Sequence, residues 1–335
     1  MEPMFYKEEC VPGKGMGCIA IKDIKKGSLV LRESPQLVLT DQMVADYDNL
    51  DHAVIESFLE MSKEQQERYL ELHNNYDVAC IEDSDNWSDG MKNDYKAVMP
   101  TLMTFPNISL HWAFEVWGIY KTNTFTDGVY LKMSRFNHSC QPNAEIFANQ
   151  GANDATDVRA LRNIKEGEEI TICYTDSDKS LWSREERRAE LKNVYNFDCN
   201  CEGCTMRDEQ IQEENENIAA FREQVAKRES VEEKRKWADE DNQELRLNLI
   251  REEIDCVKQM YKLAKTIKPM NRGWILDNIV VRGFNLSCSG ALGEEAKKFA
   301  DVGLQIAKTL FGKDNLWTQL WKKRAADPTS YLQER

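Results

Sequence analysis

The sequence predicts an α+β fold, with small β-sheets in the first part of the chain and helices alone after residue 183. Three observations support this prediction. Short extended segments alternate with turn signals up to residue 174, a spacing that favours small sheets over one parallel sheet. A helical pattern interrupts these strands between residues 43 and 73. From residue 183 onward the chain is highly charged and helical in pattern.

The expected strands are short and bounded by turn residues. Residues 17–21 and 29–31 flank the turn Lys25-Lys26-Gly27, so residues 16–33 are predicted to form a hairpin. Turns are also expected at 149–151 and 165–167, each of which contains a glycine. The remaining extended segments are expected at residues 37–39, 129–133, 144–147, 156–161 and 169–174.

The helices are predicted from apolar periodicity. Residues 109–120 fit a helix that buries Trp112, Phe114 and Trp117 or their neighbours, whereas residues 82–96 are polar and are predicted to form a loop. Residues 296–307 mix small and large apolar side chains, which permits close packing as in helical-hairpin repeats. After residue 183, helices are expected at 183–194, 208–228, 231–267, 275–286, 291–311 and 315–323.

Composition limits the classes of function. The chain has 335 residues, of which 41% are hydrophobic and 30% charged, so a sizeable core is expected and disorder is excluded. Its net charge of −14 repels phosphate backbones and attracts basic peptides, so we expect no direct nucleic-acid binding. No apolar run approaches the roughly 20 residues that a membrane span needs. The first residues do not resemble a signal peptide, so an intracellular protein without a membrane segment is expected.

The ten cysteines argue for reduced thiols or metal ligands, because no secretory signal accompanies them. Cys199, Cys201 and Cys204 lie within six residues. Three thiolates in one short loop suit a tetrahedral zinc site, which needs a fourth ligand. Free thiols are the alternative, and the tight spacing favours the metal. A zinc ion with four thiolates has no open position, so its role would be structural and a zinc-dependent hydrolase is excluded.

Several sequence motifs, and their order along the chain, are informative about the protein family. They are PGKGMGCIA at 12–20, NTF at 123–125, GVY at 128–130, RFNHSCQPN at 135–143, EGEEITICYTD at 166–176 and YNFDCNCEGC at 195–204. Together these segments resemble the SET-domain lysine methyltransferases. The resemblance is closest to the branch that carries an inserted MYND zinc finger and a helical C-terminal domain. It covers about residues 10–40 and 120–204.

The resemblance implies a domain organisation and a threaded active-site segment near NHSC. A MYND finger would fall within residues 40–106, which hold only Cys80, His52 and His73 as cysteine or histidine ligands. Two zinc sites cannot be built from these residues, so no MYND finger is expected. The implied division is a SET domain split between 1–40 and 107–182, a mostly helical insert at 41–106, a post-SET zinc-binding segment at 183–204 and an α-helical domain at 205–335.

The resemblance also implies S-adenosylmethionine as methyl donor and Cys140 as the fourth zinc ligand. Phe197 would cover the adenine of the donor. Met16 stands where relatives often have a basic residue, so one contact to the donor carboxylate is missing. Backbone groups near two glycines would approach the methionine end. The implied donor-binding residues are Lys14, Gly15, Met16, Gly17, Asn123, Asn137, His138, Tyr174, Tyr195, Asn196 and Phe197.

The implied reaction is transfer of methyl groups to the ε-amine of lysine in a protein substrate, histone or non-histone. Tyr195 matches the family's catalytic tyrosine, and Tyr174 would form another wall of the lysine channel. Alternatively, Tyr174 is simply a core-facing aromatic residue of its strand. The acidic surface favours a basic acceptor, and a monomer is expected. A SET-fold scaffold with weak activity, acting through protein–protein interaction, is the alternative function.

Overall fold

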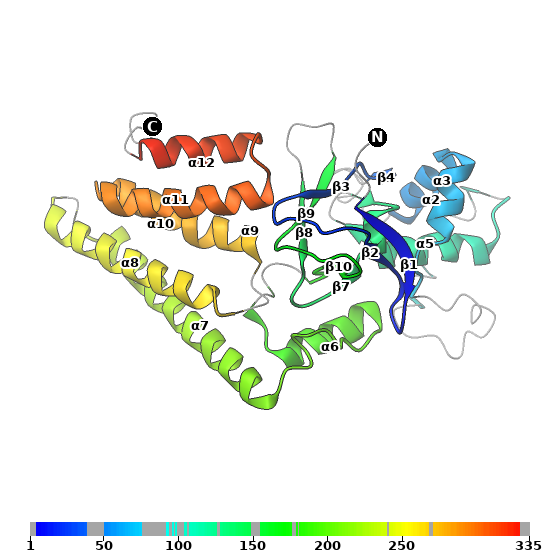
Figure 1. Ribbon diagram of the computed structural model, residues 1–335, viewed down its shortest axis with the longest axis horizontal. Coiled ribbons are helices and arrows are strands. Elements are labelled where there is room, and N and C mark those ends of the chain that lie inside the picture. Colours follow the sequence, from blue (N-terminus) through cyan, green and yellow to red (C-terminus); the bar gives the residue numbers. More distant parts are fainter. Residues whose placement is uncertain are drawn as a thin grey trace.

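The computed structural model confirms the α+β class. Small β-sheets lie in the middle, with the helices of residues 50–123 on one side and the long helices of the C-terminal half on the other (Figure 1). No helix within the described part of the chain is both long and apolar enough to cross a membrane. The structure describes residues 5–38, 50–75, 92–93, 96, 98, 104–105, 107–125, 128–148, 155–175, 179, 181–239, 241–267 and 271–328.

The largest sheet has four strands and brings the N-terminal segment beside the middle of the chain. Its order is β1 (Tyr6–Val11), β2 (Gly15–Ala20), β10 (Glu169–Ile172) and β7 (Asn137–His138). β1 and β2 are antiparallel, and the turn between them uses the positive φ of Gly13. β10 and β7 are parallel, so two motifs far apart in sequence lie side by side. The threading implied by the family resemblance stays a prediction.

Two three-stranded sheets complete the β structure. One has the order β3 (Leu29–Glu33), β9 (Thr156–Ala160) and β8 (Ala144–Ala148), and the other the order β4 (Leu37–Val38), β6 (Gly128–Val129) and β5 (Thr124–Phe125). Gly128 has a φ of 145°, and a Cβ there would lie 1.9 Å from the Leu37 carbonyl oxygen. Only glycine therefore permits this pairing of β4 with β6.

The predicted hairpin over residues 16–33 is wrong. Its turn forms, with the Ser28 amide donating to the Lys25 carbonyl and Gly27 at a φ of 81°. However, the chain crosses to another sheet, where β3 pairs with β9 and Arg32 bonds Asp157 at 2.6 Å. β2 pairs instead with β1, a strand that the sequence analysis missed because its four central residues are exposed and carry no apolar alternation.

The sequence shows one helical pattern between residues 43 and 73, but the structure has two helices in this part of the insert. α2 (Leu50–Glu60) and α3 (Lys63–Leu70) are separated at Ser62, whose hydroxyl accepts from the Gln65 amide in a capping box. α5 (Leu110–Asn123) begins after Ser109 as expected and packs against them. The predicted loop at 82–96, the turn at 149–151 and Cys80 fall mostly or wholly outside the described residues. The expected absence of a MYND finger therefore stays a prediction.

The extended segment predicted at 129–133 is shorter than expected. Only Val129 belongs to a strand, and Met133–Arg135 form a 3-10 helix, η4. The carboxylate of Glu33 accepts hydrogen bonds from the backbone amides of Lys132 and Met133, at 3.0 and 2.8 Å. These bonds bend the chain away from the sheet immediately before the NHSC motif.

The C-terminal half is helical, as predicted. The break expected near residue 229 lies at 237–242, because α7 continues and the Asn242 side chain caps the next helix by accepting from the Leu245 amide. The helices are α6 (Arg184–Tyr195), α7 (Asp208–Lys236), α8 (Gln243–Ala264), α9 (Arg272–Ile275), the π-helix η6 (Leu276–Val280), α10 (Val281–Ser289), α11 (Gly293–Leu310) and α12 (Leu316–Ala326).

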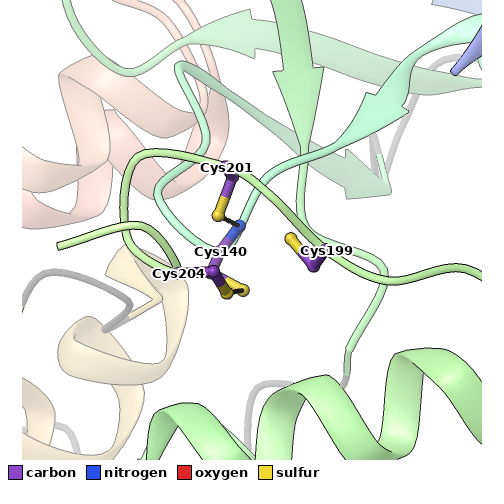
Figure 2. Close-up of side chains that lie close together, drawn as sticks. All are labelled: Cys140, Cys199, Cys201 and Cys204. Atoms are coloured by element: carbon purple, nitrogen blue, oxygen red, sulfur yellow. Dashed lines mark hydrogen bonds between the residues drawn. The ribbon is translucent and has the colours of Figure 1, made fainter. Parts of the chain in front are cut away.

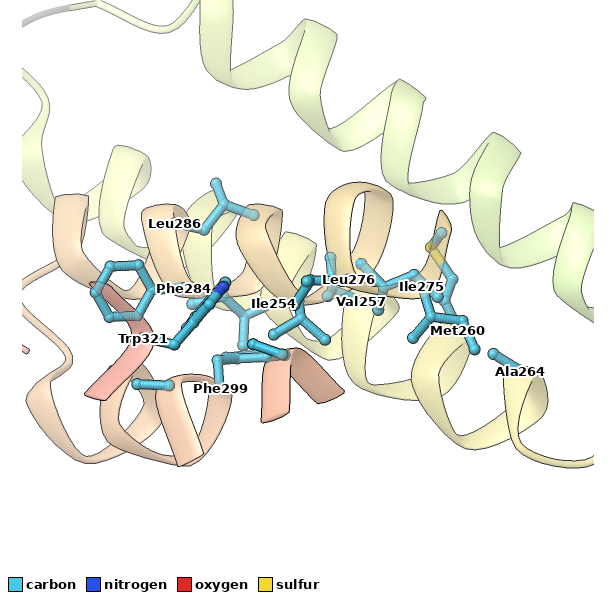
Figure 3. Close-up of a cluster of buried hydrophobic side chains, with 14 of the residues drawn as sticks. Ile254, Val257, Met260, Ala264, Ile275, Leu276, Phe284, Leu286, Phe299 and Trp321 are labelled. Carbon is cyan, nitrogen blue, oxygen red and sulfur yellow. The ribbon is translucent and has the colours of Figure 1, made fainter. Parts of the chain in front are cut away.

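The helices of this half share one apolar core. Ile254, Phe284, Phe299 and Trp321 meet between α8, α10, α11 and α12 (Figure 3). A Cβ on Gly303 would lie 2.3 Å from the Trp321 ring, so α11 and α12 approach closely at a glycine. The mixture of small and large apolar residues indicated such close packing.

A buried carboxylate joins the sheets to the C-terminal helices. Glu145 on β8 accepts a hydrogen bond from the Gly273 amide at the start of α9, at 3.3 Å. Its Oε2 atom is buried and has no hydrogen-bond partner among the described residues. Burial raises the pKa of Glu145 to about 7, against the opposing effect of the Gly273 hydrogen bond.

We expect the Glu145→Gln variant to be more stable than the wild type above pH 7. Between pH 4.5 and about 7 the folded protein holds a proton that the unfolded chain releases, so the wild-type free energy of unfolding falls as pH rises. The raised pKa of Glu145 corresponds to about 3 kcal/mol in the free energy of unfolding. A glutamine side chain can still accept the hydrogen bond from the Gly273 amide. Urea unfolding at pH 4.5 and pH 8 measures the difference. The exposed Glu213→Gln variant is the control. The prediction would be contradicted if the free energies of unfolding of Glu145→Gln and wild type differed by the same amount at both pH values.

Candidate functional site

Two of the predicted motifs are held together by the parallel pair of β7 and β10. Asn137 lies opposite Thr171 and His138 opposite Ile172. The side chain of Asn143 strengthens this pairing. It donates to the Glu169 carbonyl and accepts from the Thr171 amide, both at 2.8 Å. The sequence analysis gave Asn143 no role, although its place in the NHSCQPN motif was the available signal.

A polar network joins the N-terminal glycine segment to Asn137. The Asn137 amide donates to the Met16 carbonyl at 3.2 Å and to Glu169 at 2.9 Å. Glu169 also binds the ammonium of Lys14 at 2.6 Å. A Cβ on Gly17 would lie 2.6 Å from the Asn137 amide nitrogen, so a glycine is needed for this approach. Glu169, which the sequence analysis did not single out, therefore holds two predicted donor-binding residues in place.

Three aromatic side chains gather beside this network. The Tyr195 hydroxyl donates to the Tyr174 carbonyl at 3.2 Å, and their ring centroids are 5.1 Å apart. The Tyr174 hydroxyl donates to the Phe136 carbonyl at 2.8 Å, and burial raises its pKa above the usual value. Phe197 meets Tyr174 edge-on at 6.5 Å. Tyr174, Tyr195 and Phe197 are partly buried, and Tyr174 also packs against the apolar core around β10, so both interpretations of Tyr174 stay predictions.

The end of α6 directs Tyr195 and Phe197 into this group. α6 starts with a capping box at Ser183 and ends at Tyr195. Asn196 then adopts the left-handed conformation, with a φ of 57°, and its amide bonds the Lys192 carbonyl. This left-handed cap reverses the chain directly after Tyr195. Asn196 itself is exposed, so it acts here through its backbone.

His138 lies between the aromatic group and the cysteines. Its Nδ1 accepts a hydrogen bond from the Tyr174 amide at 3.0 Å. A backbone amide can only donate, so Nδ1 carries no proton and the hydrogen of the neutral ring is on Nε2. Nε2 lies 3.3 Å from the Cys140 sulfur. Both ring nitrogens therefore contact protein groups, which leaves the main chain of His138 for the predicted donor contact.

Asn123 is placed differently from the other predicted residues. Its amide nitrogen donates to the carbonyls of His73 and Ile119, both at 2.7 Å. These bonds fix the end of α5 against the segment after α3. The side-chain bonds of Asn123 thus go to the insert and to its own helix, and its predicted role in donor binding stays a prediction.

The four predicted metal ligands converge, as Figure 2 shows. The sulfur atoms of Cys140, Cys199, Cys201 and Cys204 all lie within 4.8 Å of one another, and all four residues are buried. Those of Cys140 and Cys204 are 3.6 Å apart, and the Cys140 amide donates to the Cys201 sulfur at 3.4 Å. Leu191, Tyr174, Tyr195 and Phe197 pack around this cluster. We call these four residues the four-cysteine cluster.

Mutual contact changes the acidity of these thiols. Hydrogen bonding with the other three cysteines raises the pKa of Cys140, whereas hydrogen bonding from Cys140 lowers the pKa of Cys199 and, to about 5, that of Cys201. Several thiolates in one buried place would repel one another. A bound cation would remove that repulsion, so this donor set is suited to a soft divalent metal.

Comparison with known proteins connects this arrangement to one family. The SET domain family matches residues 15–175. Mouse histone-lysine N-methyltransferase SMYD3 is 44% identical over 81 residues, which are 24% of this chain and 18% of that protein. Mouse Smyd1, also a histone-lysine N-methyltransferase, is 33% identical over 117 residues, covering 29% of this chain and 23% of that protein. The matches thus span about a fifth of these relatives.

Two further likenesses are longer but weaker. The SET domain-containing protein L678 of Acanthamoeba polyphaga mimivirus is 28% identical over 218 residues, covering 63% of this chain and 82% of that protein. The solved SET domain of LSMT bound to lysine and AdoHcy covers 100% of this chain and 92% of its own, at a TM-score of 0.41 and 14% identity. Residues 15–175, in which the NHSC and EEIT segments are assembled as described above, therefore form a SET domain.

Proposed function

We propose that this protein transfers methyl groups from S-adenosylmethionine to the ε-amine of lysine in a protein substrate. The observation that carries the proposal is the orientation of Tyr195 at the aromatic group. Its hydroxyl donates to the Tyr174 carbonyl, and this bond holds the phenol oxygen beside Tyr174, where it would orient the amine. The activity of the SMYD relatives, named as histone-lysine N-methyltransferases, supports the same reaction.

The aromatic group explains how an amine would be prepared. Methyl transfer is an in-line displacement, so the amine must be aligned and must be uncharged. A lysine that enters between Tyr174, Tyr195 and Phe197 loses water, which lowers its pKa and favours the neutral amine. Tyr174 cannot act as a base at neutral pH, because burial raises its pKa. The lysine proton would therefore leave through water before the transfer.

The donor site would be built from the network around Asn137. When bound, S-adenosylmethionine supplies an electrophilic methyl group on a positively charged sulfur. Lys14, Gly15 and Met16 are exposed at the start of β2, where backbone groups remain accessible. Gly17 lies tightly against Asn137, and Phe197 offers an aromatic face for a flat base. These residues fit a donor with a polar end and an aromatic end.

The four-cysteine cluster would hold a structural zinc ion. Tetrahedral zinc with bonds of about 2.3 Å places its sulfur ligands about 3.8 Å apart. The observed 3.6 Å between Cys140 and Cys204, and the 4.8 Å limit for the whole set, agree with this geometry. With four thiolates the metal has no open coordination position. It would tie the NHSC segment to the segment that carries Tyr195.

The acceptor would be a lysine in a basic protein segment. The net charge of −14 favours such a partner by electrostatic complementarity. Residues 183–204 would form the post-SET segment, and residues 205–335 a helical domain that forms one wall of the acceptor groove. The separate apolar cores around β10, around α5 and among the C-terminal helices support that division. An intracellular monomer fits these proposals.

We expect Tyr195→Phe to cripple methyl transfer while the protein stays folded. The variant loses the oxygen that would orient the amine, and misplacement of a reacting group costs roughly 100-fold in rate. The lost hydrogen bond to Tyr174 is worth only about 1 kcal/mol of stability. A peptide-array assay with labelled donor measures the rate, with circular dichroism as the folding control. Equal activity of this variant on a verified substrate would remove Tyr195 from the reaction.

We expect one zinc ion per chain, which the Cys140→Ser variant should lose. Loss of a direct ligand should weaken zinc binding by more than the roughly 10–100-fold that loss of an outer partner costs. Elemental analysis after gel filtration measures the metal. The exposed Cys10→Ser is the matched control and should retain a full equivalent. Wild-type protein without zinc would overturn the assignment.

The alternative, a scaffold with little activity, is favoured by one observation at the donor site. Met16 is 42% exposed where relatives often have a basic residue, and Lys14 already pairs with Glu169. A charge-deficient site of this kind would bind the donor carboxylate weakly. The retained Asn137, His138 and Tyr195 argue for the enzyme.

Calorimetric titration with S-adenosylmethionine separates the two functions. For the enzyme we expect saturable binding at one site, weakened about 10-fold or more in Asn137→Ala, since that change removes a hydrogen-bonding group at the donor site. Asn248→Ala, on the exposed face of α8, is the control and should bind like the wild type. Absence of measurable binding by the wild type would favour the scaffold.

A further inference from the structure

His138 contacts both halves of the candidate site at once. On one side its Nδ1 accepts from the Tyr174 amide at 3.0 Å, and on the other its Nε2 lies 3.3 Å from the Cys140 sulfur. The ring is only 5% exposed and lies against Tyr174 and Phe197, with centroid distances of 5.3 and 6.0 Å. β7 pairs with β10 through main-chain bonds, so this pairing does not depend on either side-chain contact of His138.

We propose that His138 is a positioning residue whose imidazole connects the four-cysteine cluster to Tyr174. The inference rests on zinc occupying that cluster, as proposed above. Because the Tyr174 amide must donate, the ring presents Nε2–H to the Cys140 sulfur. Zinc with four thiolates carries a net charge of −2, and an N–H donor beside a ligand sulfur stabilises that charge. The same ring then fixes the segment just after β10, where the Tyr174 carbonyl accepts from the Tyr195 hydroxyl.

Few other groups can take over this connection. The second N–H directed at the cluster is the Cys140 amide, which reaches Cys201 and not the β10 strand. Arg187 also lies near the cluster: burial acts to lower its pKa, whereas Glu214 and then Cys140 raise it. Its hydrogen bonds nevertheless go to the Trp182 carbonyl and to Glu214, not to Tyr174. Tyr195 also packs against the cluster and bonds the Tyr174 carbonyl, but the bonds of His138 are the ones that join a cluster sulfur directly to the Tyr174 amide among the described residues.

Two substitutions separate the two hydrogen bonds. In His138→Asn the amide oxygen occupies the place of Nδ1 and can still accept from Tyr174, but no group reaches Cys140. In His138→Gln the amide nitrogen reaches the place of Nε2 and can still donate to the sulfur, but the Tyr174 amide loses its acceptor. Both replacements are polar and smaller than or similar to histidine, which limits the loss of packing.

Zinc retention and the exchange of the Tyr174 amide hydrogen report the two bonds separately. We expect His138→Asn to release zinc to a chromogenic chelator about 10-fold faster than the wild type. The thiolate-to-metal absorption of its cobalt-substituted form should also shift. We expect His138→Gln to retain wild-type zinc release and cobalt absorption, but to exchange the Tyr174 amide hydrogen faster. His52→Asn, on the partly exposed α2, is the control for a histidine outside the site.

The outcome is decided by which variant changes which measurement. The connection is supported if His138→Asn changes zinc release and cobalt absorption, whereas His138→Gln changes only the exchange of the Tyr174 amide hydrogen. Zinc release at the wild-type rate in both variants would overturn the connection. It would also be overturned if zinc release and amide exchange were accelerated equally in the two variants, because a packing role alone predicts that result. Neither measurement uses donor or acceptor substrate. A failure of the proposed methyl transfer therefore leaves these results unaffected.

Discussion

The convergence of four thiols is the constraint on which the candidate site depends. Cys140 belongs to the segment after β7, and the other three cysteines follow α6 about sixty residues later. Four thiolates in contact in one buried place would repel one another unless a cation bound them. With one, the loss of chain entropy in closing this long loop is offset by metal–sulfur bonds. Tyr195 and Phe197 lie just before the cluster and are placed by it.

The second support of the site is the network behind β7 and β10. Two short strands of this kind would be marginal alone. Asn143 adds two side-chain bonds along β10, and Glu169 joins Lys14 to Asn137. The two bonds of Asn143 are buried or partly buried, so each of them is more costly to break than a surface contact. The N-terminal glycine segment and the NHSC segment are therefore held by the same carboxylate.

Much of the fold and of the site could be predicted from the sequence, and the failures have physical reasons. The motifs singled out Asn137, His138, Tyr174, Tyr195 and the four cysteines as candidates, and the structure brings these residues close together. Strand pairing is not local, so the turn at residues 25–27 was recognised but its sheet was not. β1 escaped notice because exposed polar residues fill it. Glu169 and Glu145 act through partners more than a hundred residues away, which periodicity cannot reveal.

The capped boundaries of α6 have a consequence for how this region can vary. The helix begins at a capping box and ends in a left-handed residue, so both of its ends are defined. Each residue of an α-helix advances the chain by about 1.5 Å and turns it by about 100°. Insertion or deletion of one residue between Ser183 and Asn196 would thus rotate Tyr195 off Tyr174 even if every cysteine were retained. Substitutions on the exposed face of α6 are tolerable, but the number of residues in this helix cannot change without moving Tyr195.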